Sequence, residues 1–184
     1  MRYPFEAIAL ERRGRYFWPL LALTLTLSIV MSVIGKPLTT TAAPSGIVSY
    51  ELAGSASLAR QIIESWNETA LRHAAFNLGI DFLYLVVYST TIGLACVWVT
   101  EASRARKWPL AGIGAPLAWG MWLAALLDAI ENVGLTVMLL NAVSEPWPLI
   151  AQWCAIGKFT LLVVGLIYVF GHALVQTAVR LFRR

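Results

Sequence analysis

Four ionisable residues lie within long apolar stretches of this chain, and their side chains are the best placed to do chemistry. They are three acids and one base: Asp81, Asp128, Glu131 and Lys158. A charged side chain in hydrocarbon costs from about 2.5 kcal/mol upward, so such a residue usually faces a bundle interior, pairs with a partner and marks a site. We therefore predict that the acids are acid/base or cation-binding groups, and that Lys158 is their counter-charge.

Helical spacing places further polar residues beside these charges. At about 100° per residue, five residues fall within an arc of roughly 80° on one predicted helix: His73, Asn77, Asp81, Tyr84 and Tyr88. On the next predicted helix, three residues share a face at i, i+3 and i+4: Asp128, Glu131 and Asn132. The uncharged members of the two faces are expected to form a ligand-binding, hydrogen-bonding shell: His73, Asn77, Tyr84, Tyr88 and Asn132.

The charges within the apolar stretches do not balance. Three carboxylates against one ammonium leave an excess of negative charge if all ionise, and an uncompensated buried charge is neutralised rather than kept. The positive charge has four candidate sources: retained protons, a protonated His73, a bound metal ion or a cationic ligand. The purely structural alternative is an ion pair of Lys158 with one acid, in a hydrogen-bonded network that fixes the helix register.

The composition indicates where such a set of residues would reside. Of the 184 residues, 59% are hydrophobic and only 13% are charged, and the mean hydropathy is +0.70. This is too apolar for an ordinary soluble domain, and two cysteines are too few for a disulfide scaffold. A net charge of +4 is small for a nucleic-acid-binding module, so no nucleic acid partner is expected. The composition predicts an integral membrane protein.

Four segments have the roughly 20 apolar residues that a membrane-spanning helix needs. They cover about residues 17–34, 75–100, 110–143 and 149–179, and the last three carry the four charges. We therefore predict an all-α, four-transmembrane-helix bundle that forms a single membrane domain over residues 1–184. Cys96 and Cys154 fall inside predicted spans, so we expect buried free thiols rather than a disulfide.

Basic residues predict the orientation, since lysine and arginine near short loops stay on the cytoplasmic side. They gather in the first 15 residues, at positions 104–107 and in the last five residues, all on one side of the predicted bundle. We therefore expect a multi-pass protein of the cell membrane with both termini in the cytoplasm. Counted at about 1.5 Å per residue, the four charges then lie in the outer half, within side-chain reach of one another, and form one cluster.

Residues 36–73 form the long connection between the first two spans, which this orientation puts outside the cytoplasm. Apolar residues at helical spacing predict an amphipathic helix over about residues 57–66. Residues 47–52 favour a short extended or interfacial piece. Ser65 followed by Glu68 fits a capping box, which would start a helix that runs into the second span.

Glu51 is the one charged residue in the apolar part of this connection. The connection is either a folded spacer between two spans or a lid over a polar cavity, and the sequence leaves both interpretations open. In the second interpretation Glu51 points inward, and we include it among the ligand-binding residues.

No motif identifies a reaction. The chain has no paired Glu-x-x-His, no His-Glu-x-x-His, no glycine-rich phosphate loop and no Gly-x-Ser-x-Gly turn. Its two histidines argue against a haem or a histidine-based zinc site, so no metal ligand and no cofactor is assigned.

The leading hypothesis is a polar cavity in the outer half that binds a small amphipathic or lipid-like molecule, with membrane lipid as the expected partner. Its catalytic form is isomerisation or hydrolysis of a lipid by the buried acids. A second hypothesis is a non-catalytic subunit or assembly partner of a membrane complex, or a homo-oligomer, in which the polar network is structural. A third is a proton- or cation-coupled carrier.

Overall fold

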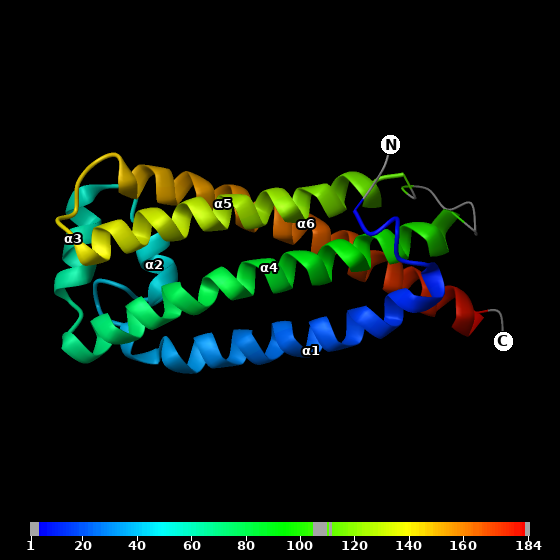
Figure 1. Ribbon diagram of the computed structural model, residues 1–184, viewed down its shortest axis with the longest axis horizontal. Helices are drawn as coiled ribbons and strands as arrows, with labels where there is room; N and C mark the ends of the chain where they lie inside the picture. The colour runs from blue at the N-terminus through cyan, green and yellow to red at the C-terminus, as the bar shows by residue number, and fades with distance from the viewer. Residues whose placement is uncertain (1–3, 105–109, 111, 183–184) are drawn as a thin grey trace.

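The computed structural model describes residues 4–104, 110 and 112–182, and the described part is helical with no strand (Figure 1). Four of its helices are long and apolar enough to cross a membrane: α1 (Leu10–Ile34), α4 (Glu68–Arg104), α5 (Gly114–Leu140) and α6 (Trp147–Phe182). Each contains most or all of one predicted span. Helix α1 starts earlier than predicted, because hydropathy marks the apolar part of a helix and backbone hydrogen bonds continue through the charged turn at Arg12 to Arg15.

The four long helices run alternately in opposite directions. Helix α1 begins, α4 ends, α5 begins and α6 ends at one end of the molecule, and the other turns lie at the opposite end (Figure 1). Arg12, Arg13, Arg15 and Arg104 therefore share one end, as predicted. Other residues used in the orientation argument lie outside the described part of the chain: Arg2, Arg106, Lys107, Arg183 and Arg184.

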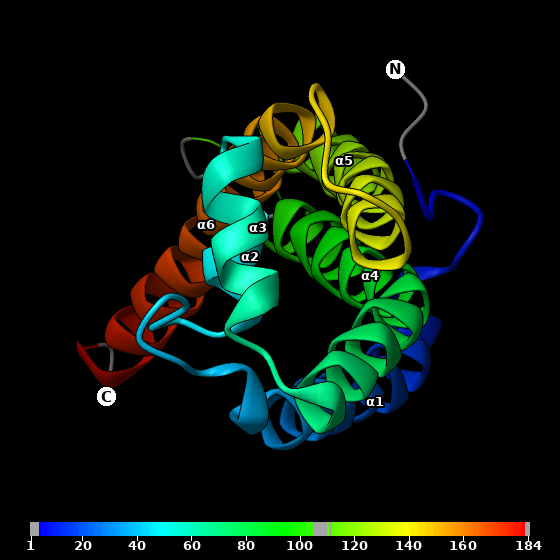
Figure 2. The same cartoon turned by 90° about the vertical axis from the view of Figure 1, so that its left-hand side faces the viewer.

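The long helices pack in the order α1, α4, α5, α6. Helix α4 is central, because it packs on α1, on α5 and on part of α6, while α5 packs along α6. In the described residues, α1 makes no extensive contact with α6. Seen end-on, α1 and α6 lie on either side of a space that the α1–α4 connection crosses (Figure 2).

The connection between α1 and α4 covers the end of the bundle at which α1 ends and α4 begins. We call its residues, 35–67, the cap. It contains a 3-10 turn, η1 (Lys36–Leu38), and two helices, α2 (Ile47–Glu51) and α3 (Ala56–Glu64). A hydrophobic core joins it to the ends of α4, α5 and α6, built around Leu38, Tyr50, Ile62, Trp66 and Leu135. The connection is thus packed against three helices rather than loosely suspended between two.

Polar contacts also fix the cap. Trp66 Nε1 donates to Leu38 O at 2.9 Å, and Tyr50 Oη donates to Leu135 O of α5 at 3.1 Å. Burial raises the pKa of Tyr50, so this hydroxyl keeps the proton that it donates. Gln152 Nε2 of α6 donates to Leu52 O at 3.1 Å. These bonds set the position of α2 above the interior of the bundle.

The cap differs from the prediction in two details. Residues 47–51 are helical rather than extended, because the apolar side chains of this segment pack into the cap core from one face of a short helix. Helix α4 is capped by Asn67, whose Oδ1 accepts from Ala70 N at 2.9 Å, and not by Ser65. Ser65 instead bonds back to Ile62 O at 2.7 Å, so the predicted capping box is wrong. The predicted amphipathic helix is confirmed as α3.

Both cysteines are buried and free, as predicted.

Candidate functional site

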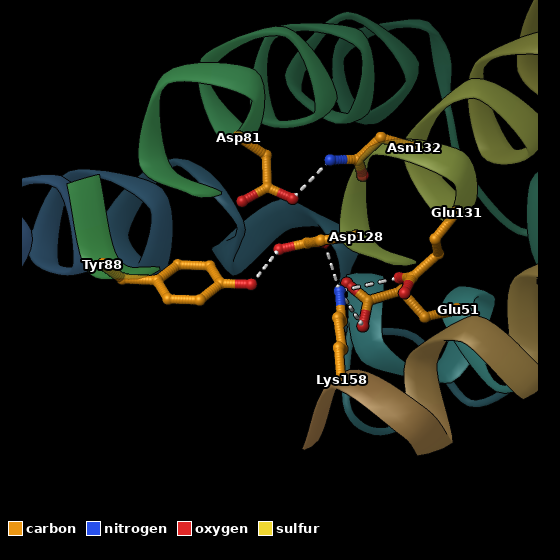
Figure 3. Close-up of polar contacts among 7 residues, drawn as sticks. All are labelled: Glu51, Asp81, Tyr88, Asp128, Glu131, Asn132 and Lys158. Atoms are coloured by element: carbon orange, nitrogen blue, oxygen red, sulfur yellow. Dashed lines mark hydrogen bonds and ion pairs between the residues drawn. The ribbon is translucent and has the colours of Figure 1, made fainter. Parts of the chain in front are cut away.

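Lys158 of α6 is the centre of a buried group of carboxylates (Figure 3). Its Nζ lies 2.7 Å from Asp128 Oδ1 and 2.9 Å from Glu131 Oε1, and both acids come from α5. A third carboxylate, Glu51 of the cap, lies 3.6 Å from Nζ. The ammonium therefore sits among three acids that come from two separate parts of the chain.

Two further contacts extend the group to α4. Tyr88 Oη donates to Asp128 Oδ2 at 2.9 Å, so both oxygens of Asp128 have partners. Asn132 Nδ2 donates to Asp81 Oδ2 at 2.7 Å. The predicted cluster is thus confirmed in its geometry: Asp128, Glu131 and Lys158 meet directly, and Asp81 joins them through Asn132. We call these seven residues the charge cluster: Glu51, Asp81, Tyr88, Asp128, Glu131, Asn132 and Lys158 (Figure 3).

Burial makes the charge cluster electrostatically costly. Glu131 is fully buried, and Asp81, the most exposed of the three cluster acids on α4 and α5, has an exposed fraction of only 7%. With Glu51 included, four carboxyl groups face one ammonium, so the excess of acid is larger than the sequence prediction, which counted only the spans. Protons or a further cation must supply the difference.

Glu51 shows how one of these acids is accommodated. Desolvation by burial raises its pKa above the ordinary value of 4.5, and the negative charge of Asp128 adds to this effect. Lys158 and a side-chain hydrogen bond with Glu131 act in the opposite direction without cancelling it. Burial therefore favours the protonated, neutral form of Glu51, although Lys158 lies nearby. The prediction that Glu51 points inward is confirmed by its position.

A cavity of about 520 Å³ lies against the charge cluster. Its polar wall contains Glu51, Asp81, Tyr88, Asp128 and Lys158 together with the hydroxyl of Tyr84. Its apolar wall contains Met31 of α1 and Phe159 and Leu162 of α6, and the cap covers one end with residues 45–48. Because α1 and α6 make no extensive contact in the described chain, the cavity is bordered by two helices with a gap between them.

Two predicted shell residues do not reach the charge cluster. Nδ1 of His73 lies 2.7 Å from Ile34 O, and Asn77 Nδ2 donates to Met31 O at 3.0 Å. Both side chains satisfy carbonyl groups at the end of α1, where a helix leaves its last carbonyls without internal partners. Asn77 also lines the cavity, whereas His73 does not, so His73 does not supply the positive charge that the cluster lacks.

Tyr84 has an intermediate position. Its hydroxyl accepts from Ser28 Oγ of α1 at 2.9 Å, and its ring lies 5.1 Å from the ring of Tyr88, centroid to centroid. It lines the cavity next to Asp81 without touching a carboxylate of the charge cluster. The five predicted polar residues of α4 therefore contact two helices. His73, Asn77 and Tyr84 bond to α1, and Asp81 and Tyr88 bond to α5.

The sequence analysis missed the parts of the cavity wall that carry no buried charge. Ser32 of α1 and Lys36 of η1 line the cavity near the cap, and Phe159 and Leu162 line it on α6. Leu162 follows Lys158 by four residues, so helical spacing from Lys158 was the available signal for it. Phe159 follows Lys158 directly and had no such signal. Lys36 had no such signal, because only the fold of the cap brings it to this cavity.

The charge cluster is not arranged as a metal centre. In the described part of the chain, no group of three or more His, Cys, Asp or Glu side chains is placed to hold a metal ion. The physical reason is Lys158, whose ammonium occupies the point where the oxygens of Glu51, Asp128 and Glu131 converge.

Comparisons with known proteins add no relative: no family model, no curated protein and no solved structure matches this chain.

Proposed function

We propose that this chain is an integral membrane protein that binds a small amphipathic molecule in the cavity between α1 and α6. The observation that carries this proposal is the combination of surfaces in one cavity: a buried polar wall with an excess of acid, together with apolar residues of α1 and α6. A molecule with a polar head and an apolar tail matches both surfaces at once.

The size and the surroundings of the cavity support a ligand of this kind. A volume of about 520 Å³ falls within the range of small-molecule sites, which is roughly 300–1,000 Å³. The helices that border it carry exposed apolar side chains away from the cavity, among them Ile29 and Val33 on α1 and Val163 and Ile167 on α6. In a bilayer such side chains face acyl chains, so an amphipathic molecule would enter sideways between α1 and α6 with its tail still in lipid.

The orientation is part of the proposal. Arg12, Arg13, Arg15 and Arg104 lie at the end opposite the cap, so the cap would lie outside the cytoplasm, in the headgroup region or above it. The cavity would then draw its ligand from the outer half of the cell membrane.

Two other functions use the same residues. A catalytic form would have the carboxyl groups of the cavity transfer protons to and from the bound molecule, as general acid/base catalysis of lipid isomerisation or hydrolysis requires. An assembly role, as a subunit of a membrane complex or of a homo-oligomer, needs only that the charge cluster fixes the helices, and a proton- or cation-coupled carrier needs it to change its charge. The cavity favours binding over assembly, because a purely structural network needs no open volume beside it.

Native mass spectrometry of the detergent-purified protein tests binding directly. Ser32→Trp together with Leu162→Trp fills the cavity from α1 and α6, so a bound amphiphile seen with the wild type should be lost. The control is Ile29→Trp with Ile167→Trp, which places two tryptophans on the same helices at exposed positions outside the cavity wall. This control should retain the bound molecule.

Two outcomes would contradict the proposal. In one, the wild type carries no bound amphiphile and takes up none from added lipid. In the other, both double variants retain the molecule equally, so that it sits elsewhere on the apolar surface. Either result would leave the structural network and the assembly role as the better description of the charge cluster.

A further inference from the structure

The charge cluster divides into two parts with different electrostatic needs. Lys158 is occupied by Asp128, Glu131 and Glu51, at 2.7, 2.9 and 3.6 Å. Asp81 stands apart from this arrangement: its Oδ2 accepts from the Asn132 amide at 2.7 Å, and among the described residues no lysine, arginine or histidine side chain lies within ion-pairing distance of it. Asp81 is therefore the acid that the protein itself leaves without a cation.

Asp81 also faces open volume. The residue is more than nine-tenths buried and lines the cavity, and the described chain supplies no hydrogen-bond donor for its second oxygen, Oδ1. A buried carboxylate oxygen directed at a cavity without a donor loses the solvation it would have in water, and a ligand donor restores it. Oδ1 of Asp81 is thus an acceptor that a ligand can satisfy with a hydrogen-bond donor, and a positively charged donor would also supply the counter-charge.

Two aromatic rings lie beside the same position. Tyr84 and Tyr88 follow Asp81 on the same helix and line the same cavity, with their ring centroids 5.1 Å apart. Their hydroxyl groups already have partners in Ser28 and Asp128, so the rings are the groups that these two residues can still offer to a ligand. An aromatic face attracts an organic cation and gives nothing to an anion, so these rings favour the same sign of ligand as Asp81.

We propose that the head of the bound amphiphile is an organic ammonium group, held by Asp81 and packed against Tyr84 and Tyr88. This inference rests on the proposed function and names the chemical class of its ligand. A carboxylate or phosphate head beside Asp81 would meet the charges of Asp81 and Asp128, while the ammonium of Lys158 is already engaged by Asp128. Lys36, the other lysine on the cavity wall, is exposed and lies in the cap. An alcohol head could accept or donate a hydrogen bond but would leave Asp81 without a counter-charge.

Three probes with one tail and different heads test this assignment: dodecylamine, dodecanol and dodecanoate. Each is titrated into the purified protein in a nonionic detergent, and binding is followed by the shift in melting temperature and by native mass spectrometry. We expect dodecylamine to bind the wild type roughly tenfold or more tightly than the other two. Butylamine, which has the head without the long tail, separates recognition of an amphiphile from recognition of any small amine.

Asp81→Asn keeps the shape of the side chain and its oxygen for the Asn132 amide, and removes the charge. In this variant the preference for dodecylamine over dodecanol should disappear, while dodecanol should bind as it does to the wild type. The matched control is Glu68→Gln, the same change at an exposed acid on the same helix outside the cavity, which should keep the preference.

The outcomes separate the two proposals. If the three probes bind equally to the wild type, or if Asp81→Asn retains the preference for the amine, the ammonium assignment is wrong while the amphiphile site stands. If none of the long-chain probes binds, or if their binding is unaffected by the tryptophan pair at Ser32 and Leu162, the amphiphile site itself is wrong. Tight binding of butylamine with no gain from the longer tail would overturn the assignment to an amphiphile in favour of a small free amine.

Discussion

Lys158 organises the interior because it is the only cation within reach of Asp128 and Glu131 in the described structure. A buried ion pair stabilises a protein little compared with well-packed apolar residues, but removing one partner leaves an uncompensated buried charge. The residues of the charge cluster are therefore coupled: each change moves charge or protons on the others.

Lys158→Met removes the ammonium and keeps most of the side-chain volume. We expect it to lower the free energy of unfolding by about 3–5 kcal/mol at pH 8, because Asp128 and Glu131 lose their counter-charge. At pH 5 the loss should be smaller, since a carboxyl group that takes up a proton no longer needs the ammonium. Chemical denaturation in detergent at the two pH values measures both losses of unfolding free energy.

Arg72→Met, at an exposed ion pair with Glu68, serves as the control and should lower the free energy of unfolding by under about 1 kcal/mol. Equal, small effects of the two changes would show that the acids do not depend on Lys158.

Glu51 gives a prediction about pH with a definite sign. Burial raises its pKa in the folded state above the ordinary 4.5, so the folded protein holds a proton that the unfolded chain releases. The stability linked to this proton is fully present below about pH 4.5 and is lost as the pH rises through the raised pKa.

Glu51→Gln mimics the protonated side chain, so its stability should fall less steeply than that of the wild type from about pH 4.5 upward. Melting temperatures of both proteins across this range measure the difference. Glu64→Gln makes the same change at an exposed acid of α3 in the same cap and should follow the wild-type curve. Parallel curves for Glu51→Gln and the wild type would mean that Glu51 is ionised in the fold.

The sequence was sufficient to find the acids and Lys158, because a charged side chain inside a long apolar segment is costly in lipid and so faces the bundle interior. It could not assign partners to His73 and Asn77. Both lie on the predicted face of α4, but the groups they meet are carbonyls at the end of α1, and no side chain in the sequence marks those carbonyls. Periodicity predicts which side of a helix is polar; the neighbouring helix decides what that side contacts.

At the scale of elements, the cap determines whether the cavity is closed at its end. Glu51 reaches Lys158 only because α2 lies across the bundle, and α2 is held to α6 by the bond from Gln152 to Leu52. Gly54 follows this contact with φ of 67°, a left-handed conformation that favours glycine. A β-carbon at Gly54 would also come within 2.5 Å of Gln152 Oε1. The junction between cap and α6 thus depends on one small residue.

Gly54→Ala should therefore loosen the cap. We expect a loss of about 1–2 kcal/mol in the free energy of unfolding and faster amide hydrogen exchange over residues 47–56, with less change in α5. Gly79→Ala is the control, because a β-carbon at Gly79 meets nothing within 4 Å and alanine favours the helix. It should be neutral or slightly stabilising. Unchanged exchange in the cap of the Gly54→Ala protein would show that Gln152 yields to the added methyl group at no cost to the attachment.

The long helices were predictable because the membrane criterion is one of length and hydropathy, and both are properties of a sequence. The cap was predictable only in part. The amphipathic pattern of α3 identified a helix, but α2 is five residues long, too short for a periodic signal, and its helical form follows from packing in the cap core. The start of α4 was misassigned to Ser65 because two cap signals lie two residues apart and only the backbone shows which one is used.

At the scale of the whole molecule, the basic residues predict which end of the bundle lies in the cytoplasm. The cap and the start of α1 lie at opposite ends, so labelling one residue at each end is enough to test this orientation (Figure 1). Ser45 on the cap and Ala7 before α1 are both exposed. Ser103, at the end of α4, is buried and would resist labelling on either side of a membrane.

Labelling of single cysteines at these positions with a membrane-impermeant maleimide reports the orientation in intact cells. If the basic end is cytoplasmic, Ser45→Cys should be labelled and Ala7→Cys should be labelled only after the cells are permeabilised. The wild type is the background control, because Cys96 and Cys154 are both buried. The reverse pattern would place the cap in the cytoplasm.

The distances within the charge cluster would be unaffected by a reversed orientation, but the gap between α1 and α6 beside the cavity would then face the inner leaflet, and the amphiphile would have to come from there. The orientation therefore decides the source of the ligand, while Asp81 and its aromatic neighbours decide its chemistry, and the two questions are answered by independent experiments.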